Sequence, residues 1–180
     1  KMNVKLESKI SEDSEFQNII QDLIRNKTVQ EMKNYRQHFN TSCYEHCYVA
    51  SYYCYKICKA LKLDYKSAAR GAMLHDLFLY DWRVKNNRSG WHAFTHGKTA
   101  YENSSKIFEL NKIEKDMIIK HMWPVTLAIP RYPQTFILTL VDKYCATMES
   151  FEEMFSGFSV RKALHYSYVF LALVIFKRKP

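Results

Sequence analysis

Six histidine and aspartate residues stand at positions that otherwise apolar helical faces would turn inward, although long stretches of chain separate them. They are His46, His75, Asp76, His96, His121 and Asp142. Burying an imidazole or a carboxylate is costly unless the group is paired or bound to a metal. Taken one at a time, each histidine is better explained as a hydrogen-bonded core residue, and each aspartate as a cap or ion-pair partner. Taken together, five predicted helices each bring a polar group into one apolar bundle, and metal binding becomes the chemistry to test.

The order of these residues along the chain resembles the HD-domain superfamily of metal-dependent phosphohydrolases. The family-wide pattern is carried by His46 in YEHCYVA, His75 and Asp76 in GAMLHDLFL, and Asp142 in LVDKYCA. His96 in FTHGKTA and His121 in IIKHMWP match the subset that binds two metals. The resemblance covers residues 40–150, which is most of the chain.

The resemblance implies two divalent cations that share one carboxylate. One cation would be held by His46, His75, Asp76 and Asp142, and the second by Asp76 as a bridge with His96 and His121. All six are nitrogen or oxygen donors, so the set suits Mn, Fe, Zn, Co or Ni. Two such cations, about 3.5–4 Å apart, acidify a bridging water and clamp the attacked phosphoryl oxygen. His75 and Asp76 are therefore the expected catalytic residues, and a metal-bridging hydroxide is the expected nucleophile.

The substrate implied by the resemblance is a phosphate ester or anhydride. In length and ligand order the chain is similar to small HD proteins that hydrolyse nucleotides or dinucleoside polyphosphates, and to small bacterial HD hydrolases. Family members that cleave cyclic dinucleotides often carry a lysine shortly after the His-Asp pair and a Gly-Tyr-Pro element. Here the stretch after the pair is LFLYD, and only Tyr132-Pro133 is similar to the second element. The expected partner is therefore a phosphorylated small molecule, in particular a nucleotide, and not a cyclic dinucleotide.

Three further residues are predicted to contact substrate phosphate or the leaving group. Lys143 follows Asp142, Arg131 lies in a turn between two prolines, and His92 precedes His96 by one helical turn. Cationic side chains bind phosphate oxygens, and an imidazole can protonate a leaving group. Lys143 and Arg131 could equally be solvated surface cations, and His92 a spare metal ligand or an ordinary loop histidine.

Two other classes of function would use the same residues. Some two-metal HD proteins resemble di-iron oxygenases, for which the same six ligands would serve. A non-catalytic regulatory or nucleic-acid-binding module would retain the metal for structure, and the net charge of +9 favours anionic partners. Lysine and arginine are scattered along the chain, so a nucleic-acid partner is not expected. A complete ligand set exceeds what a structural metal requires, so the non-catalytic module ranks third. The six-ligand order together with the basic charge makes the hydrolase the leading hypothesis.

The elements that must position these residues are predicted to be helices. The 180 residues include only four glycines and lack alternating strand patterns between glycine-rich turns, which favours an all-α, single-domain helical bundle. Residues 41–150 are expected to form the metal-binding core. Residues 1–40 are expected to be N-terminal helices packed on that core, and residues 151–180 C-terminal helices that complete the same domain.

Capping patterns predict where the ligand-bearing helices begin. Ser42 and Glu45 have capping-box spacing for a long helix that ends at about Leu63, and Asp64 can cap the next helix, which delivers the His-Asp pair near its C-terminal end. Residues 81–93 are predicted to form a loop over the site.

Three more helices are predicted in the second half of the chain. Thr95 is predicted to cap a helix that ends at about Leu110, and Asn111 with Glu114 a helix that ends before Pro124. The last of the three is predicted over residues 133–150.

The long helix predicted after Ser42 has two unlike faces. Its inner face carries four cysteines, Cys43, Cys47, Cys54 and Cys58, which are predicted to be buried thiols, with a structural zinc site as the alternative. Its other face, the Tyr/Lys face, consists of Tyr44, Tyr48, Tyr52, Tyr55, Lys56 and Lys59. A helix around residues 16–24 is predicted to cover the Tyr/Lys face, and contact with a second copy in an oligomer is the alternative.

Five cysteines and the lack of a signal-peptide pattern predict a reducing, cytoplasmic environment without disulfides. The apolar stretch YVFLALVIF, residues 168–176, is too short for a spanning helix, which needs about 20 residues. It is predicted to pack on the core, with a peripheral membrane anchor as the alternative, and no membrane span is expected.

Overall fold

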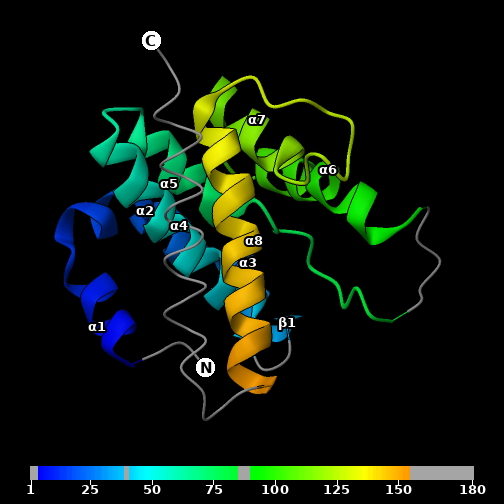
Figure 1. Ribbon diagram of the computed structural model, residues 1–180, viewed down its shortest axis with the longest axis horizontal. Helices are drawn as coiled ribbons and strands as arrows, with labels where there is room; N and C mark the ends of the chain where they lie inside the picture. Colours follow the sequence, from blue (N-terminus) through cyan, green and yellow to red (C-terminus); the bar gives the residue numbers. More distant parts are fainter. Residues whose placement is uncertain (1–3, 39–40, 85–89, 155–180) are drawn as a thin grey trace.

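The computed structural model describes residues 4–38, 41–84 and 90–154, and there it consists of helices and one small hairpin (Figure 1). The elements are α1 (Val4–Glu12), α2 (Ser14–Arg25), α3 (Lys27–Glu31), the 3₁₀ turn η1 (Met32–Asn34), β1 (Arg36–His38), β2 (Thr41–Ser42), α4 (Cys43–Ala60), α5 (Tyr65–Leu74), α6 (His92–Ser105), α7 (Lys112–Lys120) and α8 (Pro133–Met154). The all-α prediction is confirmed. The antiparallel hairpin of β1 and β2 was not predicted, because strands of three and two residues are too short to show an alternating pattern.

The helices α4 and α5 form the central pair of the molecule. α8 packs against α4, α7 packs against α5 and α8, and α6 packs against α7. Figure 1 shows α8 crossing in front of the central pair, with α1 and α2 on one side and α6 and α7 on the other. The five helices that carry the predicted ligands are therefore neighbours.

The capping box that was predicted to open α4 is present. The Ser42 hydroxyl accepts a hydrogen bond from the Glu45 backbone N–H at 3.2 Å, and the Glu45 carboxylate accepts one from the Ser42 backbone N–H at 2.9 Å. α4 ends at Ala60, earlier than the predicted Leu63. It stops there because Lys62 has a left-handed φ of 56°, which an α-helix does not contain.

The predicted caps of α5 and α7 are also confirmed. The Asp64 carboxylate accepts a hydrogen bond from the Ser67 backbone N–H at 3.0 Å. At α7, the Asn111 side chain accepts one from the Glu114 backbone N–H at 2.9 Å, and the Glu114 carboxylate returns the contact to the Asn111 N–H at 2.9 Å. These caps fix where α5 and α7 begin, and two predicted ligands, His75 and His121, lie at the opposite, C-terminal ends of these helices.

The predicted start of α6 is wrong. The helix begins at His92, so Thr95 lies within its first turns and does not cap it. The Thr95 hydroxyl donates to the Trp91 carbonyl one turn earlier at 3.1 Å, a bond that hydroxyl residues make inside helices. Trp91 precedes the helix without a side-chain capping bond, so no capping signal marked the start. Of the predicted loop, residues 85–89 lie outside the described residues.

The Tyr/Lys face of α4 is covered by α2, as predicted. The Phe16 ring packs against the rings of Tyr48, Tyr52 and Tyr55, with centroids 5.2–5.9 Å away. The Tyr55 hydroxyl donates a hydrogen bond to Glu15 of α2 at 2.9 Å. Because α2 already occupies this surface, little of it is left for a contact with a second copy.

All five cysteines are free, as predicted, and all are buried, including Cys145, for which burial was not predicted. Within the described part of the chain, no helix has both the length and the apolar character that crossing a membrane requires. The predicted helices beyond residue 154, including the apolar stretch 168–176, lie outside the described residues.

Candidate metal centre

The six predicted ligands meet in one buried cluster. Their exposed fractions run from 0% for His46 and His75 to 9% for Asp142. Among these six residues, potential ligand atoms lie within 4.8 Å of one another in two overlapping sets, of which one is His46, His75 and Asp76 and the other is Asp76, His96 and His121. Asp76 also forms a third such set with Cys43 and Cys47. Asp76 belongs to both histidine-containing sets, so one carboxylate links two pairs of histidines.

Asp142 joins the first set from α8. Its Oδ1 lies 3.0 Å from His46 Nε2 and 3.6 Å from His75 Nε2. We call His46, His75, Asp76 and Asp142 the first group, and Asp76, His96 and His121 the second group.

The two oxygens of Asp76 face different groups. Oδ2 lies 3.4 Å from His75 Nε2 in the first group. Oδ1 lies 3.4 Å from His96 Nε2 and 3.7 Å from His121 Nε2 in the second group. This is the arrangement expected of a carboxylate that bridges two cations.

Helix ends deliver three of the six predicted ligands. His75 is the C-cap residue of α5, Asp76 follows it, and His121 is the C-cap residue of α7. The last carbonyls of a helix carry a partial negative charge that favours a nearby cation. Two helix C-termini therefore add to the preference of the cluster for positive charge.

Two glycines allow the helices to approach closely enough for these contacts. A Cβ on Gly97 in α6 would lie 2.9 Å from the Ile118 carbonyl oxygen and 3.1 Å from that of Ile119. A Cβ on Gly71 in α5 would lie 2.9 Å from Met117 Sδ and would also crowd α7. Because Gly97 is next to His96, its missing side chain brings that ligand to the end of α7, where His121 lies.

Main-chain carbonyls orient three of the four histidine rings. Nδ1 lies 2.7 Å from the Ala72 carbonyl in His75, 2.7 Å from the His92 carbonyl in His96, and 2.9 Å from the Ile118 carbonyl in His121. A carbonyl oxygen only accepts, so each Nδ1 carries a proton and donates it. Each ring is thereby turned so that Nε2 points into the cluster, as metal-binding histidines are commonly held.

The fourth ring, His46, is oriented by a carboxylate that sequence analysis missed. Glu149 Oε1 lies 3.0 Å from His46 Nδ1, on the side opposite Asp142. Glu149 follows Asp142 by two helical turns on α8, so a search of the same helical face could have found it. A carboxylate behind a metal-binding histidine fixes its tautomer and raises its basicity.

A second missed residue, Gln37, orients Asp76. Its side-chain Nε2 donates a hydrogen bond to Asp76 Oδ2, and its main-chain carbonyl accepts one from Trp82 Nε1 at 3.3 Å. Gln37 belongs to β1, the strand that was not predicted, and nothing in its sequence context signals the role. The Cys43 thiol donates to the Asp76 carbonyl at 3.1 Å, which supports the same residue from α4.

Burial and mutual attraction shift the pKa values of the cluster. Burial would raise the pKa of Asp76, but His75 and the other neighbouring histidines lower it to about 2. Burial opposes ionisation of Asp142 too, but its hydrogen bond with His46 and the nearby charge of His75 hold its pKa well below the usual value. The pKa of His121 falls to about 3, because it is buried and lies near His96 and His75. At neutral pH the cluster therefore holds two carboxylates and a neutral His121.

The pKa values of His46 and His75 are raised. Burial would lower the pKa of His46 and of His75, but the carboxylates next to them raise both well above 6.5. The charge of Glu149 contributes most to the rise at His46, and that of Asp76 to the rise at His75. Positive charge is thus favoured where the first group would hold a cation.

The residues present fit a pair of divalent cations. His75 Nε2 and Asp76 Oδ1 are buried and have no hydrogen-bond partner among the described residues. His96 Nε2 and His121 Nε2 lie 2.7 Å apart although both rings carry their proton on Nδ1. Neutral rings would then set two lone pairs against each other, which a shared positive charge relieves. The unpartnered atoms all face the centre of the cluster.

The three predicted substrate-contacting residues have different locations. His92 stacks on His96 with ring centroids 4.5 Å apart, and its Nδ1 lies 3.0 Å from the Tyr80 hydroxyl. Lys143 is half-buried, with Nζ 3.4 Å from the Trp123 carbonyl oxygen. Arg131 instead lines a separate pocket, which contains none of the six ligands.

Comparison with known proteins finds no protein-family model, no curated protein and no solved structure that matches this chain. The chemistry of the cluster is therefore assigned from its own residues. Histidine nitrogen and carboxylate oxygen are donors that Mn, Fe, Co, Ni and Zn all accept.

Proposed function

We propose that this protein is a metal-dependent phosphohydrolase that binds two divalent cations through the six-residue cluster. The observation that carries the proposal is that Asp76 belongs to both ligand sets and turns one oxygen to each. The ligand order resembles the two-metal subset of the HD-domain superfamily, and we propose membership of that superfamily. The substrate we propose is a phosphate ester or anhydride, with nucleotides as the first class to test.

Two cations bound at this cluster would supply an acidified water and charge neutralisation for the attacked phosphoryl group. The role of the protein is to hold the donor atoms in place before the cations bind. Main-chain carbonyls fix the rings of His75, His96 and His121, and Gln37 holds the carboxylate of Asp76. Ligands fixed in this way do not have to be ordered when the cations bind.

Two side chains next to the cluster fit roles toward the substrate. The half-buried ring of His92 lies between Trp82, at 5.5 Å, and His96, at 4.5 Å. Trp82 is 37% exposed, so this is a side from which a substrate can approach, and we assign to His92 the proton for the leaving group. Lys143 is next to Asp142 in sequence, and we assign to its ammonium group charge complementation of the phosphate.

The experiment is an activity screen of the purified protein loaded in turn with Mn, Fe, Co, Ni and Zn. Nucleotides and other phosphate esters are offered, and released phosphate is measured. His75→Ala and Asp76→Ala should each lower turnover by about a thousandfold or more. Asp76→Ala removes a ligand from both proposed cations, and His75→Ala removes a ligand from the first cation, without which the second would act alone. Asp22→Ala, which removes a carboxylate that pairs with Arg70 on the surface of α2, is the control and should stay active.

Unchanged turnover in the His75 and Asp76 variants would contradict the proposal. The same screen run with and without oxygen separates hydrolysis from oxidation at a di-iron centre. Equal turnover without oxygen supports hydrolysis, whereas turnover that requires iron and oxygen would assign the cluster to oxidation. A protein that binds two cations and acts on no phosphate ester would point to a regulatory module.

A further inference from the structure

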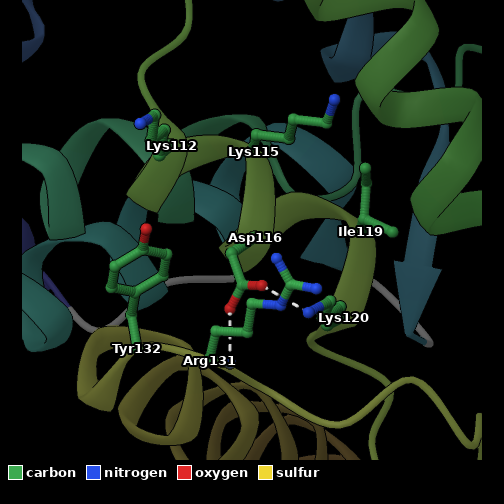
Figure 2. Close-up of a pocket in the computed structure, with 7 residues that line it drawn as sticks. All are labelled: Lys112, Lys115, Asp116, Ile119, Lys120, Arg131 and Tyr132. Carbon is green, nitrogen blue, oxygen red and sulfur yellow. Dashed lines mark hydrogen bonds and ion pairs between the residues drawn. The ribbon is translucent and has the colours of Figure 1, made fainter.

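A second polar site lies on the outer face of α7, apart from the metal cluster. It is a cavity of about 300 Å³ between α7 and the turn that precedes α8. Seven residues line it: Lys112, Lys115, Asp116, Ile119, Lys120, Arg131 and Tyr132 (Figure 2). We call this cavity the basic pocket, since four of its side chains are cationic and one is acidic.

The one carboxylate of the basic pocket is fully used within the chain. Asp116 is buried, with 6% exposed, and it accepts hydrogen bonds from the Arg131 backbone N–H at 2.9 Å and the Thr135 hydroxyl at 2.8 Å. Its other oxygen lies 2.6 Å from Lys120 Nζ. The contacts with Arg131 and Thr135 hold the turn and the start of α8 against α7. Together with Lys120 they leave Asp116 little capacity to neutralise further cations.

Three of the four cations in the basic pocket lack a carboxylate partner among the residues that the structure describes. Lys112 and the Arg131 guanidinium make no ion pair there, and Lys115 Nζ lies over the Tyr101 ring, 4.9 Å from its centroid. Lys120 is committed to Asp116 and to the Ile129 carbonyl at 3.0 Å. Like charges gathered around one cavity repel one another, and an anion bound between them removes that cost.

The shape and lining of the basic pocket indicate the kind of anion. Figure 2 shows Tyr132 on one side of Asp116 and Ile119 on the other, so an aromatic and an aliphatic surface flank the charged centre. The volume is at the lower end of the range for small-molecule sites, about 300–1,000 Å³. A guanidinium and two ammonium groups match a dianion with several oxygens better than a carboxylate.

We propose that the basic pocket binds a phosphate monoester, with Arg131, Lys112 and Lys115 contacting the phosphate. This site does not depend on the hydrolase activity proposed for the metal cluster. It also gives Arg131, which sequence analysis placed at the substrate phosphate, a phosphate-binding role at another location.

The phosphate group can be offered by a soluble ester or by a lipid headgroup, and a neighbouring feature makes the distinction worth testing. The segment that leads to Arg131 exposes three alternate apolar side chains, Val125 at 47%, Leu127 at 93% and Ile129 at 67%. Lys120 holds this segment at the rim of the basic pocket through the Ile129 carbonyl. Apolar side chains next to a basic site are the combination that peripheral membrane proteins use.

The test is a binding titration of the full chain in excess chelator, so that cations at the metal cluster do not contribute. The probes are adenosine monophosphate, adenosine without phosphate, and phosphatidylcholine vesicles with or without phosphatidic acid, whose headgroup is also a phosphate monoester. We expect the monophosphate or the phosphatidic acid vesicles to bind, and adenosine not to bind. Asp76→Ala should bind the same probe as well as the wild-type chain does, since the metal cluster is not involved.

The double variant Lys112→Gln with Arg131→Gln should weaken binding by about tenfold or more, because two charge-assisted contacts are lost. The matched control is Lys66→Gln with Lys98→Gln, which removes two exposed charges from α5 and α6. Circular dichroism checks that each variant is folded. Equal weakening in the control would show diffuse charge attraction and overturn the proposal, as would a lack of binding to any phosphate-bearing probe.

Binding of the Leu127→Ser variant to vesicles and to adenosine monophosphate distinguishes the two sources of the phosphate. Loss of vesicle binding with unchanged binding of adenosine monophosphate assigns the pocket to a lipid headgroup aided by the apolar segment. Binding of the soluble monophosphate alone, unaffected by this substitution, assigns it to a soluble ester.

Discussion

The two groups of the proposed metal-binding cluster are held in place by different means. The first group draws on two carboxylates, Asp76 and Asp142, and has a third, Glu149, behind His46. The second group has the shared Asp76 as its one carboxylate, and its histidines depend on main-chain carbonyls and on the close approach of α6 to α7 at Gly97. One group is therefore built mainly from charged side chains, and the other mainly from helix packing.

This difference predicts unequal affinities for the two cations. More anionic ligand oxygens attract a divalent cation more strongly, so the first group should fill at lower metal concentration. The second group should fill only when α6 and α7 keep their spacing. Different substitutions should therefore weaken cation binding in both groups, in the second group alone, or in the first group alone.

The largest effect is expected from Asp76→Ala, which removes the carboxylate common to both groups. We expect the bound metal to fall from two ions to at most one weakly held ion per chain, and turnover to fall by about a thousandfold or more. Equilibrium dialysis with elemental analysis measures the first effect. Two ions still bound in this variant would show that Asp76 does not link the groups.

The second prediction concerns the packing of the second group alone. In Gly97→Ala the added methyl group meets the Ile118 carbonyl oxygen at 2.9 Å, so α6 and α7 must separate slightly. Overpacking of this kind costs about 1–3 kcal/mol, which corresponds to about a 5–150-fold weaker second ion. A metal titration should show one unchanged and one weakened binding event.

A control separates lost stability from lost spacing in that experiment. Leu23→Ala in α2 opens a cavity away from α6 and should lower the unfolding free energy by about 2–5 kcal/mol. Both ions should still bind to it at the wild-type concentrations. If Leu23→Ala also weakens the second ion, the effect of Gly97→Ala reflects general destabilisation.

The third prediction weakens the first group and spares the second. Glu149→Gln keeps an acceptor for His46 Nδ1 but removes the charge behind the ring, so His46 becomes a poorer ligand. Partners of metal-binding histidines typically change metal affinity by about 10–100-fold, and we expect about tenfold because the hydrogen bond can persist. Glu102→Gln, an exposed residue of α6, removes the same charge and should leave both affinities unchanged.

The smallest effect is expected from Gln37→Ala. Asp76 then loses a hydrogen bond to Oδ2 but keeps its ionic neighbours, so either ion should weaken by less than about tenfold. Isothermal titration calorimetry can resolve a change of that size. A loss as large as that of Asp76→Ala would mean that the hairpin itself holds the cluster together.

The sequence predicted that six histidine and aspartate side chains turn inward, and the structure brings them together, but the residues that orient them were not predicted. Their inward positions could be predicted because helical spacing is regular, whereas their role as metal ligands was implied by the family resemblance and stays a prediction. Glu149 is on the same helical face as Asp142 and could have been predicted in the same way. Gln37 could not, since its role depends on a short hairpin whose strands leave no periodic signal.

Helix starts, too, could be predicted where residues close in sequence mark them and not elsewhere. Capping side chains at Ser42, Asp64 and Asn111 predicted three helices correctly, because the capping bond involves residues close in sequence. α6 begins without such a bond, and the Thr95 prediction was wrong. The location of Arg131 in a separate pocket could not be predicted either, because it depends on Asp116 holding the turn against α7.

Anomalous diffraction from crystals of the manganese-loaded protein tests the central claim most directly. We predict two manganese peaks about 3.5–4 Å apart, with one oxygen of Asp76 on each ion, Asp142 on one and His121 on the other. A single peak, or two peaks that do not both contact Asp76, would contradict it.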